Sequence, residues 1–318
     1  MEGTSLPRPV ADVAAQDALA TEQRNPRTLD IDVRATFDIL AMLNDEDALV
    51  PGAVRAVLPE LARVVDRATD RFRAGGRIFY FGAGTSGRIG AIDAAELPPT
   101  FSISGERVVA RLAGGVDTLE RAHEEAEDDR AQGRHDASDV AAHDVVFGLT
   151  ASGTTPYVLG AIAAAHDAGA LCVVVSSNDN PVLRASSDHY LHVETGPEPI
   201  AGSTRMKAAT AQKLILNSFS TTLMIRLGMT YSNLMVDLAQ NNDKLRARAV
   251  RLLVQATGRS EEDCQRQLAW AGGRVKVALL SLLTTADEAA IVAALERAGG
   301  RTREALRQLD GRPPREGG

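Results

Sequence analysis

The chain has 318 residues, of which 44% are hydrophobic and 24% are charged, a composition typical of a globular protein with one large domain and smaller appendages. Its 35 basic and 42 acidic residues give a formal net charge of −7, which argues against a nucleic-acid partner or an anionic membrane surface. No apolar run approaches the roughly 20 residues that span a bilayer, and the N-terminal region lacks a signal-peptide pattern. The two cysteines, Cys172 and Cys264, lie in apolar patterns and are predicted to be reduced packing residues. We therefore expect a cytoplasmic protein without a structural metal site.

Two helical patterns precede the first predicted strand. Apolar residues between 33 and 41 share one helical face, and the acidic run at 44–47 is predicted to end that helix. A second pattern extends from about 51 to 72 and contains Pro59, so it fits either two short helices or one kinked helix. The first 20 residues show no clear period and are expected to be mobile.

The most informative stretch is 77–101, which reads RIFYFGAGTSGRIGAIDAAELPPTF. An apolar run at 78–81 predicts a buried strand, and a helix is predicted at 89–96, ended by Pro98 and Pro99. Between them lies a loop with glycines at positions 82, 84 and 87. Such a loop lets a ligand approach the backbone closely, and the first amides of the following helix favour an anion.

The glycine loop matches the G-x-G-x-x-G pattern of dinucleotide-binding proteins, so NAD or NADP is the first ligand to consider. Such a site needs an acidic residue about 20 positions further on, at the end of the next strand, to bind the ribose. The next apolar run, 108–112, is followed by Ala-Gly-Gly and has no acid at its end. The hydroxyls of Thr85 and Ser86 suit a phosphomonoester or a sugar better than a pyrophosphate. The loop therefore favours a sugar phosphate over a dinucleotide.

Strands and helices alternate from residue 78 to residue 227. Further strands are predicted at 108–112, 144–150, 170–176 and 189–194, and helices at 117–131, 157–166 and 202–227. Near-continuous apolar strands that alternate with helices indicate an α/β fold with a parallel sheet covered on both faces. Ligands of such folds bind at the carboxyl ends of the strands.

The remainder of the chain predicts a smaller helical region. A helix is expected from 244 to 256, followed by three short helical patterns at 260–271, 274–283 and 286–298. The tail 311–318 is expected to be disordered. We predict three parts: an N-terminal arm with helices over 1–60, the α/β domain over 61–228, and a helical region over 229–318.

Hydroxyl side chains follow two of the predicted strands. Thr85 and Ser86 follow the first strand, and the turn Ser152-Gly153-Thr154-Thr155 follows the third. Helix capping accounts for one hydroxyl per helix, but not for three hydroxyls in one four-residue turn. The turn therefore predicts a phosphate site. Three basic residues are candidates for charge-assisted contacts with the phosphate, or else are solvated surface charges: Arg88, Arg205 and Lys207.

Glu96 follows Ile89 by seven positions and Ile92 by four, so the three residues share a helical face that we expect to point at the sheet or at a cleft. Near the predicted end of its helix, the helix dipole also disfavours a carboxylate. Both effects favour the protonated form that a general acid needs near neutral pH. The alternative is a surface glutamate at a frayed helix end.

Glu127 is less distinctive. It forms a stripe at helical spacing with Glu120 and Glu124, and such stripes are usually solvated faces. His123 is likewise more typical of a structural position. On the residues alone, a catalytic role for Glu127 is not favoured.

Five segments carry a resemblance to a known family: TEQRNP at 21–26, GAGTSGRIGAIDAAELPPTF at 82–101, ASGTTPY at 151–157, AGSTRMKAATAQKL at 201–214 and NLMVD at 233–237. They resemble the bacterial N-acetylmuramic acid 6-phosphate etherases, lyases of the sugar isomerase (SIS) fold, and the similarity covers most of the chain. The resemblance implies a flavodoxin-like, five-stranded parallel sheet flanked by helices. It also implies a homodimer with sites near the subunit interface, and no metal or organic cofactor.

The family reaction removes the D-lactyl ether of N-acetylmuramic acid 6-phosphate and gives N-acetylglucosamine 6-phosphate and D-lactate, a step in the recycling of cell-wall amino sugars. In the open-chain aldehyde, the hydrogen on carbon 2 is acidic because the carbonyl delocalises the resulting charge. One base removes this proton, one acid protonates the lactate that leaves from carbon 3, and water adds to the unsaturated aldehyde. Two carboxyl groups of different acidity suffice for these proton transfers.

The resemblance assigns roles to residues of this chain. Glu96, in Ala-Ala-Glu-Leu-Pro-Pro, matches the family's acid, and Glu127, in Glu-Ala-Glu-Asp, matches its second carboxylate, the base. Glu125 stands where the family has glycine, which leaves Glu124 and Glu125 as alternative bases. The phosphate is expected at the turn 152–155. Further residues expected to bind the substrate are Thr85, Ser86, Gly87, Ser203 and Lys207.

Three other functions stay open at this point. A non-enzymatic sugar-phosphate sensor of the SIS fold keeps the phosphate hydroxyls but needs neither glutamate. An aldose–ketose isomerase also abstracts the carbon-2 proton but needs no acid directed at carbon 3. A SIS-type transcription regulator needs a basic helix-turn-helix before the sheet, which residues 1–70 do not predict. Glu96 with its flanking prolines favours the lyase.

Overall fold

The computed structural model describes residues 19–121, 123–237 and 243–311. This part of the chain forms two compact units, which we call the sheet unit and the helical unit. The sheet unit contains the residues up to 64 together with 78–91 and 110–216, and the helical unit contains 65–77, 92–109 and the residues from 217 onward. The expectations for the first 18 residues and for the tail from 312 fall outside the described residues, and the three-part division stays a prediction.

The sheet has five strands, as predicted for a parallel α/β fold, and their order is β2-β1-β3-β4-β5. The strands are β1 (Ile78–Gly82), β2 (Val108–Leu112), β3 (Val145–Leu149), β4 (Leu171–Ser176) and β5 (His189–His192). The pairs β1/β3, β3/β4 and β4/β5 are parallel. Every residue of β1, β3 and β4 is buried, which explains why these strands are continuously apolar in the sequence.

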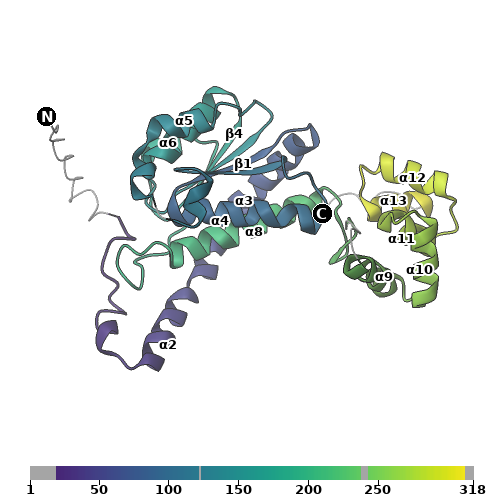
Figure 1. The fold of residues 1–318 in the computed structure, drawn as a ribbon, viewed down its shortest axis with the longest axis horizontal. Coiled ribbons are helices and arrows are strands. Elements are labelled where there is room, and N and C mark those ends of the chain that lie inside the picture. The colour runs from purple at the N-terminus through teal and green to yellow at the C-terminus, as the bar shows by residue number, and fades with distance from the viewer. Residues whose placement is uncertain (1–18, 122, 238–242, 312–318) are drawn as a thin grey trace. The chain divides into compact units, whose positions relative to one another are not determined.

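Helices cover both faces of the sheet. Figure 1 shows α5 (Arg130–Asp136) and α6 (Pro156–Asp167) over one face, and the starts of α3 (Val50–Arg73), α4 (Gly84–Phe101) and α8 (Lys207–Arg226) over the other. Two glycines show how closely the helices pack on the strands. A Cβ at Gly148 of β3 would lie 2.8 Å from Val158 of α6, and a Cβ at Gly90 of α4 would lie 2.9 Å from Tyr80 of β1. A short helix, α7 (Pro181–Ala185), follows β4.

Proline does not end two of the helices in which it lies. α3 is one helix with Pro59 inside it, and α4 runs to Phe101 through Pro98 and Pro99, so the predicted end at Glu96 is wrong. A proline inside a helix removes the hydrogen bond to the carbonyl four residues earlier and crowds that carbonyl, yet both helices continue through their prolines. The carbonyl of Pro98 still accepts a hydrogen bond from the amide of Ser102, which ends the helix with a φ of 56°.

The predicted helix over 117–131 is also wrong. The chain forms two 3₁₀ segments, η2 (Val116–Leu119) and η3 (Glu124–Asp128), before α5 begins. Asp129 is the N-cap of α5, and its carboxylate accepts from the amide of Gln132 at 2.8 Å. A capping residue has non-helical backbone geometry, so the acidic run cannot continue as one α-helix into α5.

The segment before α3 differs from the prediction at its acidic end. A short 3₁₀ turn, η1 (Ile31–Val33), leads into α2 (Thr36–Asp47), which includes the acidic run that was predicted to end it. Glu46 is the one buried residue of this fully described helix. Its apolar residues Phe37 and Leu40 are 78% and 61% exposed.

The helical unit contains five C-terminal helices: α9 (Asp243–Thr257), α10 (Glu261–Trp270), α11 (Val275–Leu283), α12 (Glu288–Arg297) and α13 (Thr302–Leu309). The first four confirm the predicted patterns, and α13 was missed because its eight residues offer few apolar positions. A two-stranded antiparallel hairpin, β6 (Thr230–Tyr231) with β7 (Leu234–Met235), precedes them. These helices share a core that includes Cys264, and burial raises the pKa of this thiol. Both cysteines are free and buried, as predicted.

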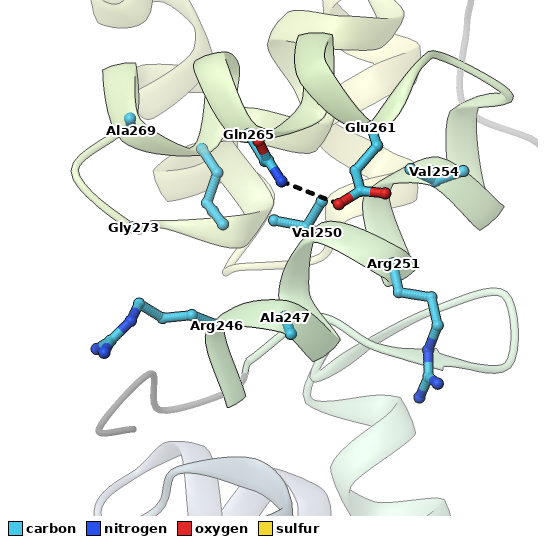
Figure 2. Close-up of a pocket in the computed structure, with 10 residues that line it drawn as sticks. Arg246, Ala247, Val250, Arg251, Val254, Glu261, Gln265, Ala269 and Gly273 are labelled. Atoms are coloured by element: carbon cyan, nitrogen blue, oxygen red, sulfur yellow. Dashed lines mark hydrogen bonds between the residues drawn. The ribbon is translucent and has the colours of Figure 1, made fainter. Parts of the chain in front are cut away.

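A pocket of about 720 Å³ opens between α9 and α10 of the helical unit (Figure 2). Val250 and Val254 form part of its apolar lining, and Arg246 and Arg251 extend from the same helix. None of the predicted site residues lines this pocket. In the part of the chain that the structure describes, no single helix is long and apolar enough to cross a membrane.

Candidate active site

The glycine loop after β1 is built for close packing. A Cβ at Gly82 would lie 2.7 Å from the amide nitrogen of Gly87, and a Cβ at Gly87 would lie 2.6 Å from the carbonyl oxygen of Gly82. These two glycines therefore let the end of β1 touch the first turn of α4. Thr85 and Ser86 lie in that first turn and are half-buried. Because the first amides of a helix have no partner within it, these residues can offer both amides and hydroxyls to an anion.

The turn after β3 is held by its own hydroxyl groups. The side chain of Thr150 lies 2.8 Å from the hydroxyl of Thr155 and accepts from the amide of Gly153 at 3.1 Å. The hydroxyl of Ser152 accepts from both the amide and the hydroxyl of Thr154, at 3.1 and 3.0 Å. Thr155 is the N-cap of α6 but its side chain makes no capping hydrogen bond. Helix capping therefore does not explain these hydroxyls.

Gly153 fixes the position of this turn. Its φ is 77°, and a Cβ there would lie 3.1 Å from the hydroxyl of Ser176 and 3.2 Å from the carbonyl of Asn178. The turn therefore rests against the segment that follows β4. Gly153 is required here both for its conformation and for the lack of a side chain.

Lys207 is placed differently from the predicted phosphate contact. It is fully buried at the start of α8, and its ammonium group donates to Glu46 Oε2 at 2.7 Å. In this structure the Lys207 ammonium group is therefore paired with a protein carboxylate. Ser203, four residues earlier, is half-buried in the turn before α8 and donates its amide to the carbonyl of Ile200.

The two arginine candidates lie in different surroundings. Arg88 donates from Nε to the carbonyls of Thr118 and Leu119, at 3.0 and 3.2 Å, so its guanidinium holds η2 against α4. Arg205 is exposed.

Glu96 lies on an exposed face of α4. Ile92, one turn earlier, is 56% exposed, so this face does not pack on the sheet, and its position in a cleft stays a prediction. The buried face of the same part of the helix carries Ala94, Leu97 and Phe101 instead. The carboxyl group of Glu96 is therefore accessible, as a proton donor to a substrate must be.

Glu127 is exposed on η3, close to the end of β2. Because η2 and η3 are separate segments, Glu120 and Glu127 do not form a stripe on one helix, although both are exposed to solvent as that interpretation expects. A Cβ at Gly114 would lie 3.1 Å from the Cβ of Ala126, so η3 packs directly on the turn after β2. A pocket of about 450 Å³ lies beside this contact. Its lining residues are Gly114, Gly115, Ala126, Asp129, Gln132 and Asp136.

Asn178, just after β4, is a residue that the sequence analysis missed. It is 4% exposed, and its side-chain amide donates to the carbonyl of Ala151 at 2.9 Å and to the hydroxyl of Thr21 at 3.0 Å. Its side-chain oxygen accepts from the amide of Ala20 at 2.8 Å. All its side-chain hydrogen-bonding groups are engaged, and they join the N-terminal segment to the hydroxyl turn.

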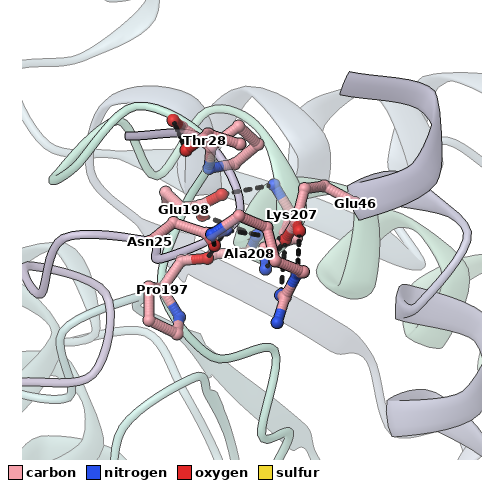
Figure 3. A network of polar contacts seen from close by, with 9 residues as sticks. Asn25, Thr28, Glu46, Pro197, Glu198, Lys207 and Ala208 are labelled. Atoms are coloured by element: carbon pink, nitrogen blue, oxygen red, sulfur yellow. Dashed lines mark hydrogen bonds and ion pairs between the residues drawn. The ribbon is translucent and has the colours of Figure 1, made fainter. Parts of the chain in front are cut away.

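A second missed feature is the buried polar network around Glu46, shown in Figure 3. Besides Lys207, the carboxylate accepts from Asn25 Nδ2 at 2.8 Å and from the guanidinium of Arg27. The pKa of Glu46 is lowered to about 2, mainly by the hydrogen bond from Arg27 and further by those from Lys207 and Asn25. Burial acts in the opposite direction and raises it.

Glu198 belongs to the same network. Its buried carboxylate accepts from the amides of Lys207 and Ala208 at 2.8 and 2.9 Å, and so caps the start of α8. Burial raises the pKa of this group, although the two amides act in the opposite direction. Among the described residues, no group of three or more His, Cys, Asp or Glu side chains is arranged to hold a metal ion.

Comparison with known proteins places these features in a family. Residues 60–166 match the model of the glucokinase regulatory protein N-terminal SIS domain. The chain is 57% identical to the N-acetylmuramic acid 6-phosphate etherase of Thermobifida fusca, over 83% of this chain and 87% of that protein. It is 48% identical to the Brucella anthropi etherase, over 91% of this chain and 95% of that protein. It is 47% identical to etherase 1 of Bacillus licheniformis, over 91% of this chain and 96% of that protein.

These identities extend over 83 to 91% of this chain, so they include most of the sheet unit and most of the helical unit. The chain belongs to the N-acetylmuramic acid 6-phosphate etherase family.

Proposed function

We propose that the protein cleaves the D-lactyl ether of N-acetylmuramic acid 6-phosphate and releases N-acetylglucosamine 6-phosphate and D-lactate. The observation that carries this proposal is the identity of 45 to 57% with relatives that bear this name, over most of each chain. The accessible Glu96 and the hydroxyl turn after β3 support it from the structure. We place the reaction in the cytoplasm, in keeping with two free cysteines.

Substrate binding begins with the phosphate in this proposal. Ser152 and Thr154 supply hydroxyls that already share hydrogen bonds, and Thr155 lies at the start of α6, where the helix dipole favours an anion. Thr85, Ser86 and Ser203 bind the sugar. Because Lys207 is buried against Glu46, we assign it no direct contact with the phosphate.

The carboxylates then move two protons. Glu127 takes the proton from carbon 2 of the open-chain aldehyde, and the electrons of that C–H bond form the double bond between carbons 2 and 3. The bond between carbon 3 and the lactyl oxygen breaks, and Glu96 gives its proton to that oxygen. Water then adds to carbon 3, and carbon 2 takes up a proton. Each of these transfers suits a positioned carboxyl group.

We also propose that the protein is a homodimer and that α2 contacts the second copy. Seven successive residues, 37–43, include six apolar side chains, yet Glu46 alone is buried within this fully described 12-residue helix. A helix of this length is marginal in water by itself, and a continuous apolar run at its surface is normally covered. A symmetric pair of chains is the commonest way to cover such a surface.

Sedimentation analysis tests the dimer. We expect the double variant Phe37→Asp/Leu40→Asp to dissociate at concentrations where the wild type is a dimer. Val182→Asp is the control, because Val182 is a 60% exposed apolar residue on α7 and lies outside α2. A wild type that is monomeric at all concentrations contradicts the proposed dimer.

The decisive experiment for the reaction is D-lactate release from N-acetylmuramic acid 6-phosphate by the purified protein in a buffer with a chelator. Release at a catalytic rate supports the etherase. Tight binding of the sugar phosphate without release contradicts it in favour of a sensor. Exchange of the carbon-2 proton with solvent without lactate release contradicts it in favour of an isomerase-type reaction.

A further inference from the structure

The segment Ala20–Thr28, which we call the brace, contacts two segments that are distant from it in the sequence. At its start, Asn178 joins the amide of Ala20 and the hydroxyl of Thr21 to the carbonyl of Ala151. Ala151 directly precedes the hydroxyl turn 152–155. One end of the brace is therefore bonded, through a single buried side chain, to the backbone of the proposed phosphate site.

The start of the brace also contacts the turn that carries Ser203. The carbonyl of Thr21 accepts from the amide of Gly202 at 3.0 Å. A Cβ at Gly202 would lie 2.7 Å from the Glu22 carboxylate, so the brace lies directly against this glycine. Gly202 has a φ of 76°, which a side chain would strain. Thr21 therefore contacts both turns: its carbonyl binds the Ser203 turn directly, and its hydroxyl is joined to the hydroxyl turn through Asn178.

The far end of the brace is anchored by the Glu46 network. Asn25 donates both to Glu46 and to the carbonyl of Pro197, at 2.8 and 3.2 Å, and Thr28 donates to the carbonyl of Pro199 at 2.7 Å (Figure 3). Glu46 in turn accepts from Lys207, the first residue of α8. Ser203 therefore lies between two attachments: Pro197 and Pro199 bind the brace before it, and Lys207 binds Glu46 after it.

We propose that the brace positions the Ser203 turn relative to the hydroxyl turn, with Asn178 and the Glu46–Lys207 pair as positioning residues that act through it. The proposal rests on the proposed function in assigning those two turns to the substrate. Thr21 is fully buried, and Asn25, Glu46 and Lys207 are at most 2% exposed, so these contacts are shielded from competition by water. A contact that only covered the surface would not need buried, hydrogen-bonded side chains on both sides of one turn.

The first measurement is hydrogen–deuterium exchange, which does not depend on the reaction. Thr21→Val keeps the shape of the side chain and removes the acceptor that Asn178 uses. We expect the amides of 151–155 and of 200–206 to exchange faster together, by about tenfold. Asp144→Asn is the matched control: Asp144 is 3% exposed and accepts from the amide of Ala141, at the amino end of β3, away from both turns. Faster exchange in one turn without the other contradicts the proposed role of the brace, and this result does not depend on which reaction the protein catalyses.

The second measurement links the brace to the substrate. We expect Asn178→Asp, which loses both amide donors, to raise KM for N-acetylmuramic acid 6-phosphate at least tenfold and to change kcat less. The affinity for N-acetylglucosamine 6-phosphate, measured by calorimetry, falls by the same factor. If Asn178→Asp does not fold, Thr21→Val replaces it, with an expected rise of two- to fivefold. Asp144→Asn lowers the melting temperature but leaves KM unchanged.

A double-variant cycle tests whether the Lys207–Glu46 contact and the Thr21–Asn178 contact both act through the brace. Lys207→Met removes the charge that holds α8 to Glu46, and Thr21→Val removes the contact to Asn178. If both act through the brace, the combined rise in KM is smaller than the product of the single effects. Independent effects, or a KM within twofold of the wild type in each variant, overturn the proposal. Absence of lactate release by the wild type overturns the proposed function and leaves the exchange result to decide the brace.

Discussion

Two sets of glutamates in this protein have opposite environments. Glu46 and Glu198 are buried, and backbone amides or cationic side chains bind their oxygens. Glu96 and Glu127 are exposed, the first on α4 and the second on η3. A buried carboxyl group is out of reach of a substrate, whereas an exposed one is accessible to it. The comparison therefore separates residues that hold the structure from residues available for proton transfer.

The largest effect is expected from Glu96→Gln. It removes the proposed proton donor to the leaving lactate, and we expect lactate release to fall by about 10³-fold, within the range for loss of a general acid. Exchange of the carbon-2 proton with solvent persists, because the base is intact. The free energy of unfolding should change by less than about 0.5 kcal/mol, as for other exposed positions. Glu296→Gln, an exposed glutamate on α12, is the control; full lactate release by Glu96→Gln contradicts the assignment.

Glu127→Gln tests the other accessible carboxylate. We expect carbon-2 proton exchange and lactate release to fall together, by about 10²- to 10³-fold, because the elimination cannot begin without the base. Glu125→Gln is the matched control, since Glu125 is exposed on the same 3₁₀ segment. If Glu125→Gln slows the exchange and Glu127→Gln does not, the base is Glu125.

For the buried set, Glu46→Gln should affect stability more than chemistry. It leaves the Lys207 ammonium buried without its carboxylate, a change that typically costs about 3–5 kcal/mol. We expect urea denaturation to show this loss in the free energy of unfolding. A change below 1 kcal/mol contradicts the structural role of the pair and removes the distinction between the two sets.

The sequence predicts the sheet well because its signals are local. Five apolar runs mark the five strands, and the glycines after β1 and β3 sit where a side chain would meet backbone or neighbouring polar atoms. The sequence left open whether Glu96 faces the sheet or the surface, because apolar spacing alone does not tell which side of a helix meets the sheet. Ile92, for example, is exposed although its apolar side chain favours a buried position.

The brace and its anchor depend on contacts that local patterns do not contain. Glu46 lies in an acidic run that predicts a helix end, and the lysine that neutralises it is 161 residues away. Asn178 is 157 residues from Thr21. A hydrogen bond between such distant residues leaves no periodic signal in either segment. The segments TEQRNP and AGSTRMK carry the family resemblance, but only the fold shows that they touch.

Acid offers a milder way to test the buried set. The pKa of Glu46 is lowered from 4.5 to about 2 in the folded state, so its contribution to stability is complete above about pH 4.5 and is lost as the pH falls toward 2. This shift corresponds to about 3 kcal/mol. We expect the difference in unfolding free energy between the wild type and Glu46→Gln to shrink by that amount between pH 5 and pH 2. Glu198 titrates in both proteins, so its opposite shift largely cancels in this difference. A difference that is constant with pH contradicts the low pKa.

The smallest effect is expected where hydroxyls, not charges, are removed. Ser152→Ala/Thr155→Ala deletes two hydroxyls of the turn after β3, and each hydrogen bond to a charged phosphate contributes about 1.5–3 kcal/mol. Because these hydroxyls also bond to Thr150 and Thr154, part of that gain is offset by contacts they already make in the free protein. We therefore expect the preference for the phosphorylated over the unphosphorylated sugar to fall by about 10²-fold. An unchanged preference places the phosphate elsewhere, and the amides of Thr85 and Ser86 at the start of α4 are then the next site to test.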